Sequence, residues 1–313
     1  MTRTVVITGA AGFIGGALAR SLRREGWDVR PVVRAAKDDD PEGALALGDL
    51  ASVDESAVAS ALAGTDAVLH FAGLAHRRPG LQDEDAAYRA ANVVATERLM
   101  RAAIRAHVPR FVLASTVKVS GESTSEGQPF TPADPPQPEE PYARSKRDAE
   151  TALIDATRST STTPIVLRLP LTYGHGAKGN FARLVAAVAA GHALPLASIA
   201  NRRSLLSLRN LEGAIVAILA AASPPAGIHF VADADSVSTP ELVRAIANAL
   251  GRPARLYAMP VPFLRLAGAL MGRRGEVARL ADSLEVDTSS LAASTSWRPA
   301  SFAIEARDVA VRL

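Results

Sequence analysis

A tyrosine and a lysine four positions apart are the side chains of this sequence best suited to acid/base chemistry. They are Tyr142 and Lys146, in the run Pro-Tyr-Ala-Arg-Ser-Lys. On a helix this spacing places both side chains on one face, with the phenol beside the ammonium group. A neighbouring cation favours the phenolate, so we expect a lowered tyrosine pKa and proton exchange with a substrate oxygen near neutral pH. Such pairs also occur on solvated helix faces, so the elements around this one decide its meaning.

The N-terminus supplies a turn suited to binding phosphate groups. An apolar run at 4–8 is followed by Gly9, Gly12, Phe13, Ile14 and Gly15, and then by a helical pattern. Glycines allow the backbone to approach a pyrophosphate, and the free amides at the start of the next helix attract it. A purely structural turn is the alternative. Strand, glycine turn and helix in this order favour nucleotide binding.

The apolar runs along the first half of the chain alternate with helical patterns. This alternation predicts an α/β fold with a doubly wound parallel sheet and a bound nucleotide at the carboxyl ends of its strands. The runs lie at 4–8, 28–33, 67–71, 110–115 and 164–169. Residues 121–141 are rich in Ser, Thr, Gly and Pro, which predicts an ordered loop at the mouth of the site or a lid.

The glycine turn, Ser115-Thr116 after a strand, and Tyr142 with Lys146 twenty-six residues after Thr116 together resemble the extended short-chain dehydrogenase/reductases. The closer resemblance is to the nucleotide-sugar epimerase, dehydratase and 4-ketoreductase group, and it spans almost the whole chain. It implies a Rossmann-type domain at 1–170, with a return segment at about 201–222. A smaller α/β sugar-nucleotide domain would be formed by 171–200 and 223–313.

The resemblance also implies which residues contact a nicotinamide dinucleotide. Asp49 and Leu50 fall where the family contacts adenine. Lys146 contacts the ribose as well as acting on the tyrosine. The full set implied is Gly9, Gly12, Phe13, Ile14, Gly15, Arg34, Lys37, Asp49, Leu50, Phe71, Ala72, Gly73, Asn92, Ser115, Tyr142, Lys146 and Pro170.

The end of the second strand bears on which dinucleotide is used. An acid there binds the ribose hydroxyls of NAD, whereas this chain has Arg34 followed by Lys37. A guanidinium suits a 2'-phosphate, so the sequence favours NADP. The acids at 38–40 act against this preference, and NAD stays open.

By the same resemblance, Tyr142 is the general acid or base at the C4 oxygen of a sugar, and Lys146 lowers its pKa. Thr116 hydrogen-bonds that oxygen, with Ser115 as the adjacent candidate. The 4,6-dehydratases carry an Asp-Glu pair after this threonine, where this chain has Val117 and Lys118. We therefore exclude dehydration. Lys118 is either a substrate contact or a surface lysine.

The second half of the chain implies the substrate class. Asn180 and Arg203 match family positions that contact a nucleotide diphosphate, which favours a UDP-hexose or a 4-keto-6-deoxy relative. Leu171 stands where many epimerases have asparagine. A 4-ketoreductase, which Arg34 favours, and a 4-epimerase both remain open. The alternative that is not an enzyme is a non-catalytic NADP-binding regulatory or assembly protein of the same fold.

The composition limits the possible partners and compartments. Of 313 residues, 35 are Lys or Arg and 32 are Asp or Glu, which makes nucleic acid an improbable partner. There is no cysteine, no predicted metal site and no predicted membrane span, which agrees with a cytoplasmic enzyme. Family likeness implies a homodimer through helices within 84–107 and 142–160.

Overall fold

The five apolar runs predicted to be strands lie side by side in one parallel sheet. The computed structural model describes residues 3–35, 44–75 and 83–310. Within these ranges the main sheet has seven strands in the order β3-β2-β1-β4-β5-β6-β9, all of them parallel. Their bounds are β1 Thr4–Thr8, β2 Asp28–Val33, β3 Leu45–Ala46, β4 Ala67–His70, β5 Arg110–Thr116, β6 Thr163–Leu169 and β9 Gly227–Phe230. The predicted strands are confirmed to within one residue at each end.

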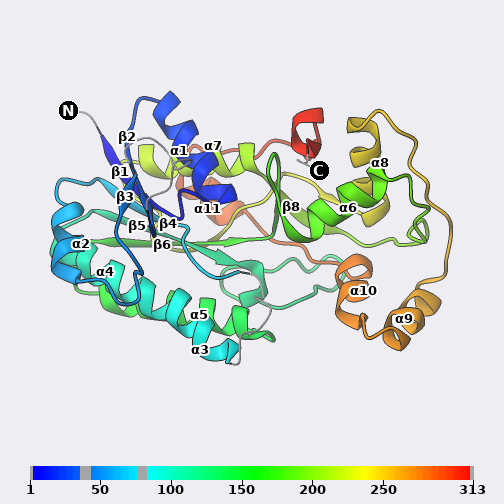
Figure 1. The fold of residues 1–313 in the computed structure, drawn as a ribbon, viewed down its shortest axis with the longest axis horizontal. Helices are drawn as coiled ribbons and strands as arrows, with labels where there is room; N and C mark the ends of the chain where they lie inside the picture. Colours follow the sequence, from blue (N-terminus) through cyan, green and yellow to red (C-terminus); the bar gives the residue numbers. More distant parts are fainter. Residues whose placement is uncertain (1–2, 36–43, 76–82, 311–313) are drawn as a thin grey trace.

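Helices cover both faces of this sheet, which confirms the doubly wound arrangement (Figure 1). One face carries α1 Phe13–Arg24, α7 Leu208–Ala220 and α11 Ser289–Ser294. The other carries α2 Glu55–Ala61, α4 Ala95–Arg105 and α5 Pro141–Thr157, with the short α3 Glu84–Tyr88 and the π-helix η1 Arg89–Val94 leading into α4. Because both faces are covered, central strands such as β1 are buried at every residue, which explains why the runs are continuously apolar.

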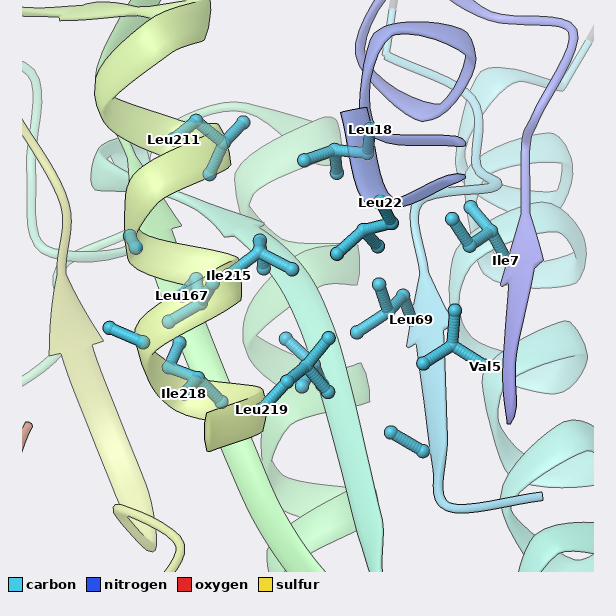
Figure 2. Packing of buried hydrophobic residues seen from close by; sticks show 14 of the residues in the cluster. Val5, Ile7, Leu18, Leu22, Leu69, Leu167, Leu211, Ile215, Ile218 and Leu219 are labelled. Carbon is cyan, nitrogen blue, oxygen red and sulfur yellow. The ribbon is translucent and has the colours of Figure 1, made fainter. Parts of the chain in front are cut away.

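The packing of α1 and α7 on the sheet places the start of α1 at the carboxyl end of β1. Leu18 and Leu22 of α1 meet Leu211 and Ile215 of α7 above the strands (Figure 2). Ile7 of β1 lies in the same buried cluster. α7, which covers most of the predicted return segment, packs against the large sheet.

The smaller lobe is built around a three-stranded sheet in the order β10-β8-β7. Its elements are β7 Leu171–Tyr173, β8 Arg203–Ser207, β10 Ser236–Val237, α6 Gly179–Ala189, α8 Thr239–Ala249, α9 Val261–Leu270, α10 Arg274–Ala281 and the 3₁₀ turn η3 Ala306–Val309. Two segments expected here lie elsewhere. Residues 227–230 form β9 at the edge of the large sheet, and α11 packs on β9. A strand of four residues, two of them buried, is too short to show a periodicity in the sequence.

The segment at 121–140 is a loop tied to the C-terminal part of the chain. The backbone amide of Thr124 donates to the carbonyl of Ser283 at 2.8 Å, and that of Phe130 donates to Glu285 at 2.8 Å. The loop therefore joins the two lobes beside the carboxyl end of β5. Within the described ranges, none of the helices has the length and apolarity needed to cross a membrane.

Candidate functional site

The glycine turn after β1 is held tightly against the segment that follows β4. Gly9 has a φ of +73°, and a Cβ there would lie 2.7 Å from the amide nitrogen of Ala72. Gly12 caps the start of α1, and a Cβ at Gly15 would collide with the carbonyl of Gly9. The turn therefore requires glycine for its conformation and for its closeness to neighbouring backbone. The same feature leaves a cradle beside the first amides of α1, which fits a pyrophosphate.

A pocket of about 570 Å³ opens at the carboxyl ends of β1, β2 and β4. The structure brings eight of the predicted cofactor residues into its lining, namely Gly9, Gly12, Arg34, Asp49, Leu50, Phe71, Ala72 and Gly73. Phe13, Ile14 and Gly15 form the first turn of α1 directly behind the cradle, and Pro170 links β6 to β7. Lys37 lies outside the described residues. The pocket has the place and the backbone lining that a dinucleotide needs.

Arg34 lies at the rim of this pocket beside an acid. Its Nη2 atom is 3.9 Å from Oδ2 of Asp49, and the two side chains are 62% and 52% exposed. A positive and a negative side chain thus lie together where the adenosine ribose of a dinucleotide would bind. A guanidinium at this exposed rim can turn towards a 2'-phosphate.

Asn92 serves as a link between two parts of the site. Its side chain accepts from the amide of Leu74 at 2.8 Å and donates to the carbonyl of Leu74 at 3.0 Å. It also donates to the hydroxyl of Ser145 in α5 at 2.9 Å. Asn92 sits in the π-helix η1, a distortion that often marks functional sites. It contacts Gly73 and Leu74, which line the pocket. Direct contact between Asn92 and a cofactor stays a prediction.

The structure brings Tyr142, Thr116 and Lys146 together at the carboxyl end of β5. Helix α5 begins with Pro141 in its first turn, so Tyr142 stands at the amino end and Lys146 follows one turn later. The Thr116 hydroxyl lies close enough to the Tyr142 phenol to act on its pKa. The Tyr142 ring lies 5.9 Å from that of Tyr88, and Lys146 is only 5% exposed.

The pKa values in this cluster correct one sequence-based expectation. Burial, helped by Tyr88 and opposed by the Thr116 hydrogen bond, raises the pKa of Tyr142 to about 12. Burial, opposed by Glu150, lowers the pKa of Lys146 to about 8. The expected lowering of the tyrosine pKa by the lysine is wrong for this state, because loss of water disfavours the charged form of both groups. Tyr142 is therefore protonated at neutral pH and is poised to donate.

A buried ion pair that sequence reasoning missed lies beneath these residues. Nη2 of Arg168 is 2.8 Å from Oε2 of Glu150, and both side chains are almost completely buried. The hydroxyl of Ser115, predicted to contact the cofactor, instead donates to Glu150, and Arg168 donates to Ser120 at 3.1 Å. Two sequence signals point to this pair. Glu150 continues the four-residue spacing of Tyr142 and Lys146, and Arg168 is a lone charge within an apolar strand.

His70 is a second buried group that the sequence analysis did not single out. Its Nδ1 lies 2.6 Å from the Thr8 hydroxyl, and its Nε2 lies 3.0 Å from the Thr96 hydroxyl. Burial, with a further contribution from Lys146, lowers the pKa of His70 to about 3. It is a neutral group that joins the carboxyl ends of β1 and β4 to α4.

The residues predicted to contact substrate lie on the side of the smaller lobe. Lys118 Nζ is 2.6 Å from Glu140 and 3.0 Å from Glu122, so its charge is already paired. Arg203 at the start of β8 donates to the carbonyl of Asp282 at 2.8 Å. Burial lowers the pKa of Arg203, and the charge of the nearby Arg279 acts in the same direction.

Asn180 is exposed in the first turn of α6, where its side-chain oxygen accepts from Arg183. The structure thus gives Asn180 and Arg203 separate partners within the smaller lobe. Within the described residues there is no cluster of three or more His, Cys, Asp or Glu side chains that could hold a metal ion.

Comparisons with known proteins agree with this arrangement. The family model described as NAD dependent epimerase/dehydratase family matches residues 5–232. The chain is 35% identical over 303 residues to a UDP-glucose 4-epimerase of Vibrio cholerae, covering 96% of this chain and 92% of that one. It is 27% identical to a ceramide reductase of Caulobacter vibrioides, covering 95% and 86%. The solved structure of MoeE5 in complex with UDP-glucuronic acid and NAD matches with a TM-score of 0.74 and 25% identity, covering 98% and 96%.

Proposed function

We propose, given that the chain belongs to the NAD-dependent epimerase/dehydratase family, that it oxidises or reduces C4 of a nucleotide sugar as a 4-epimerase or a 4-ketoreductase. The observation that carries this proposal is the grouping of Tyr142, Thr116 and Lys146 at the end of β5, one strand away from the pocket edge at Phe71–Gly73. This grouping supports a proton donor beside the proposed dinucleotide site.

Each residue of the cluster has a distinct task in the proposed reaction. Tyr142, with its raised pKa, gives a proton to a C4 ketone oxygen or takes one from a C4 hydroxyl. Thr116, beside Tyr142, donates a hydrogen bond to the same oxygen. Lys146, with its lowered pKa, shares the buried site and favours the phenolate when Tyr142 has lost its proton. A bound nicotinamide supplies hydride chemistry at C4.

The residues after Thr116 support the exclusion of dehydration. Val117 is buried and packs with Phe230 and Leu284. Lys118 is paired with Glu122 and Glu140. An apolar side chain and a paired cation cannot provide the acid and base that elimination of water requires.

The substrate side supports a nucleoside diphosphate. Arg203 and Arg279 lie close enough for each to influence the other electrostatically, and Arg279 is 3.5 Å from Glu140. Two guanidinium groups on the smaller lobe suit the oxygens of a diphosphate. The Vibrio cholerae relative is named for a UDP-sugar, and the MoeE5 structure holds one, which supports a UDP-hexose or a 4-keto-6-deoxy UDP-hexose here.

For the cofactor we propose NADP, with NAD as the second candidate. Arg34 at the pocket rim supports NADP, and the adjacent Asp49 together with the NAD in MoeE5 supports NAD. We also propose a homodimer, formed by α3 to α4 together with α5. Light scattering in solution tests this assembly.

The test of the proposed function incubates the full chain separately with UDP-glucose, UDP-N-acetylglucosamine and a 4-keto-6-deoxy UDP-hexose. NADPH or NADH absorbance and the C4 configuration of the product are followed together. Net consumption of reduced cofactor identifies a reductase, and an equilibrium of two C4 epimers without net consumption identifies an epimerase. Cofactor binding without turnover of any of these sugars contradicts the proposal and supports a non-catalytic binding protein.

A further inference from the structure

Helix α9 of the smaller lobe is apolar on both of its sides. Its inner side packs into the lobe through Leu264 and Gly268, the latter against Val277 of α10. On its outer side Phe263, Leu266 and Leu270 are 64%, 57% and 82% exposed. Spacings of three and four residues align these three side chains in one stripe. Arg265, the one charged residue of this helix, is paired with Asp282, and the exposed apolar stripe beside it is suited to contact something beyond the chain.

Neighbouring residues extend the stripe and give it a strong positive charge. Met271 is 64% exposed and Tyr257 is 46% exposed. The segment 252–275 contains five arginines and no acid; Arg265 is paired with Asp282, and Glu276, the next residue along the chain, is paired with Arg183. Arg273 and Arg274 directly follow the stripe and are exposed. We call these residues the α9 face, namely Tyr257, Phe263, Leu266, Leu270, Met271, Arg273 and Arg274.

We propose that the α9 face binds the surface of an anionic lipid bilayer. Apolar side chains beside arginines are the composition of helices that lie in the membrane interface, where the apolar side enters the acyl boundary and the cations meet acidic headgroups. The helix has ten residues, about half the length that a membrane span needs. It can therefore lie on a bilayer but cannot cross it.

Charge favours a lipid surface over a second copy of the chain. In a two-fold contact each α9 face would meet an identical one, so both of the surfaces brought together would carry Arg273 and Arg274. An anionic surface has the complementary sign. Figure 1 shows α9 at the end of the smaller lobe that lies away from β1, β2 and β3. A membrane contact there leaves the mouth of the dinucleotide pocket open.

The test is sedimentation of the full chain with vesicles of phosphatidylcholine alone or with about one-third phosphatidylglycerol. Binding is expected on the mixed vesicles and is expected to weaken as NaCl rises. Leu270→Asp should lower the partition coefficient by about tenfold or more, because a leucine no longer enters the apolar boundary. Since Leu270 is 82% exposed, the thermal midpoint of this variant should stay close to that of the unaltered protein.

A matched pair of variants isolates the arginines. Arg273→Glu with Arg274→Glu should abolish the preference for anionic vesicles. Arg24→Glu with Arg307→Glu makes the same charge change at side chains that are 73% and 66% exposed and lie on α1 and in η3, and it should change binding by no more than about twofold. Three results overturn the proposal. They are protein that stays in the supernatant, equal binding to neutral vesicles, or a Leu270→Asp variant that dissociates an oligomer without changing vesicle binding.

Discussion

At the scale of single residues, burial controls the proton chemistry of the site. Loss of water raises the pKa of Tyr142 and lowers those of Lys146 and His70, so all three tend towards their neutral forms. A neutral phenol beside Thr116 can donate to a ketone oxygen, and it becomes a base once a substrate and cofactor change its surroundings. The spacing of the pair is visible in the sequence, whereas the sign of its pKa shifts depends on the packing of distant residues.

Lys146 is expected to reduce stability while it serves the reaction. Its pKa is about 8 in the folded chain against 10.5 normally, so between these values the unfolded state binds more protons and stability rises with pH. Below pH 8 the full cost applies, about 3 kcal/mol at most. Lys146→Met should therefore increase the free energy of unfolding at pH 7 by about 1 to 3 kcal/mol and abolish turnover. Urea unfolding measures this, and a less stable variant contradicts the expectation.

Arg34 is expected to set the preference between the two dinucleotides. Arg34→Ala should weaken NADP binding by about tenfold or more, because one charge-assisted contact to the 2'-phosphate is lost. NAD binding should change by less than about threefold. Titration calorimetry with both dinucleotides measures the difference. An equal effect on the two would show that Arg34 does not bind the 2'-phosphate. Arg30→Ala, on the strand that Arg34 follows, provides a control outside the pocket lining.

At the scale of elements, the site depends on contacts that hold α5 against two strands and one loop. Glu150 of α5 binds Arg168 of β6 and Ser115 of β5. Asn92 ties Ser145 of α5 to Leu74 after β4. These contacts fix the position of α5 along the direction of the strands. They therefore fix the position of Tyr142 relative to Thr116 and the pocket.

Breaking the buried ion pair should be more costly than replacing it. Arg168→Met leaves the Glu150 carboxylate buried without its partner and should cost about 3 to 5 kcal/mol of unfolding free energy. Arg168→Met combined with Glu150→Leu removes both charges and should recover much of this loss. Chemical denaturation of the single and double variants measures the difference. A double variant as unstable as the single one would show that the charges themselves, rather than their pairing, hold α5 in place.

At the scale of the whole molecule, the chain is an enzyme of the NAD-dependent epimerase/dehydratase family, and the proposed reactive groups lie between the pocket at β1, β2 and β4 and the smaller lobe. The loop at 121–140, bonded to 283 and 285, connects the lobes next to Thr116. A substrate bound through Arg203 on the smaller lobe would thus extend towards Tyr142. A proposed cofactor pocket in the large lobe and a proposed substrate contact in the smaller lobe agree with the proposed chemistry at one carbon of a nucleotide sugar.

Much of this arrangement could be predicted from local sequence patterns. The buried strands and the glycine turn are continuous in sequence, so their periodicity and spacing identify them. The Glu150–Arg168 pair, the link through Asn92 and the place of β9 arise from residues far apart in the chain. Their partners are set by tertiary packing, and a single sequence carries only indirect traces of it.

The most direct test of the central claim is the turnover of Tyr142→Phe on the nucleotide sugar that the unaltered protein converts. Removing the hydroxyl takes away the proposed general acid and leaves the pocket lining intact. Turnover should fall by about two to four orders of magnitude, with dinucleotide affinity near that of the unaltered protein. Turnover equal to that of the unaltered protein would contradict the claim that Tyr142 moves the proton at C4.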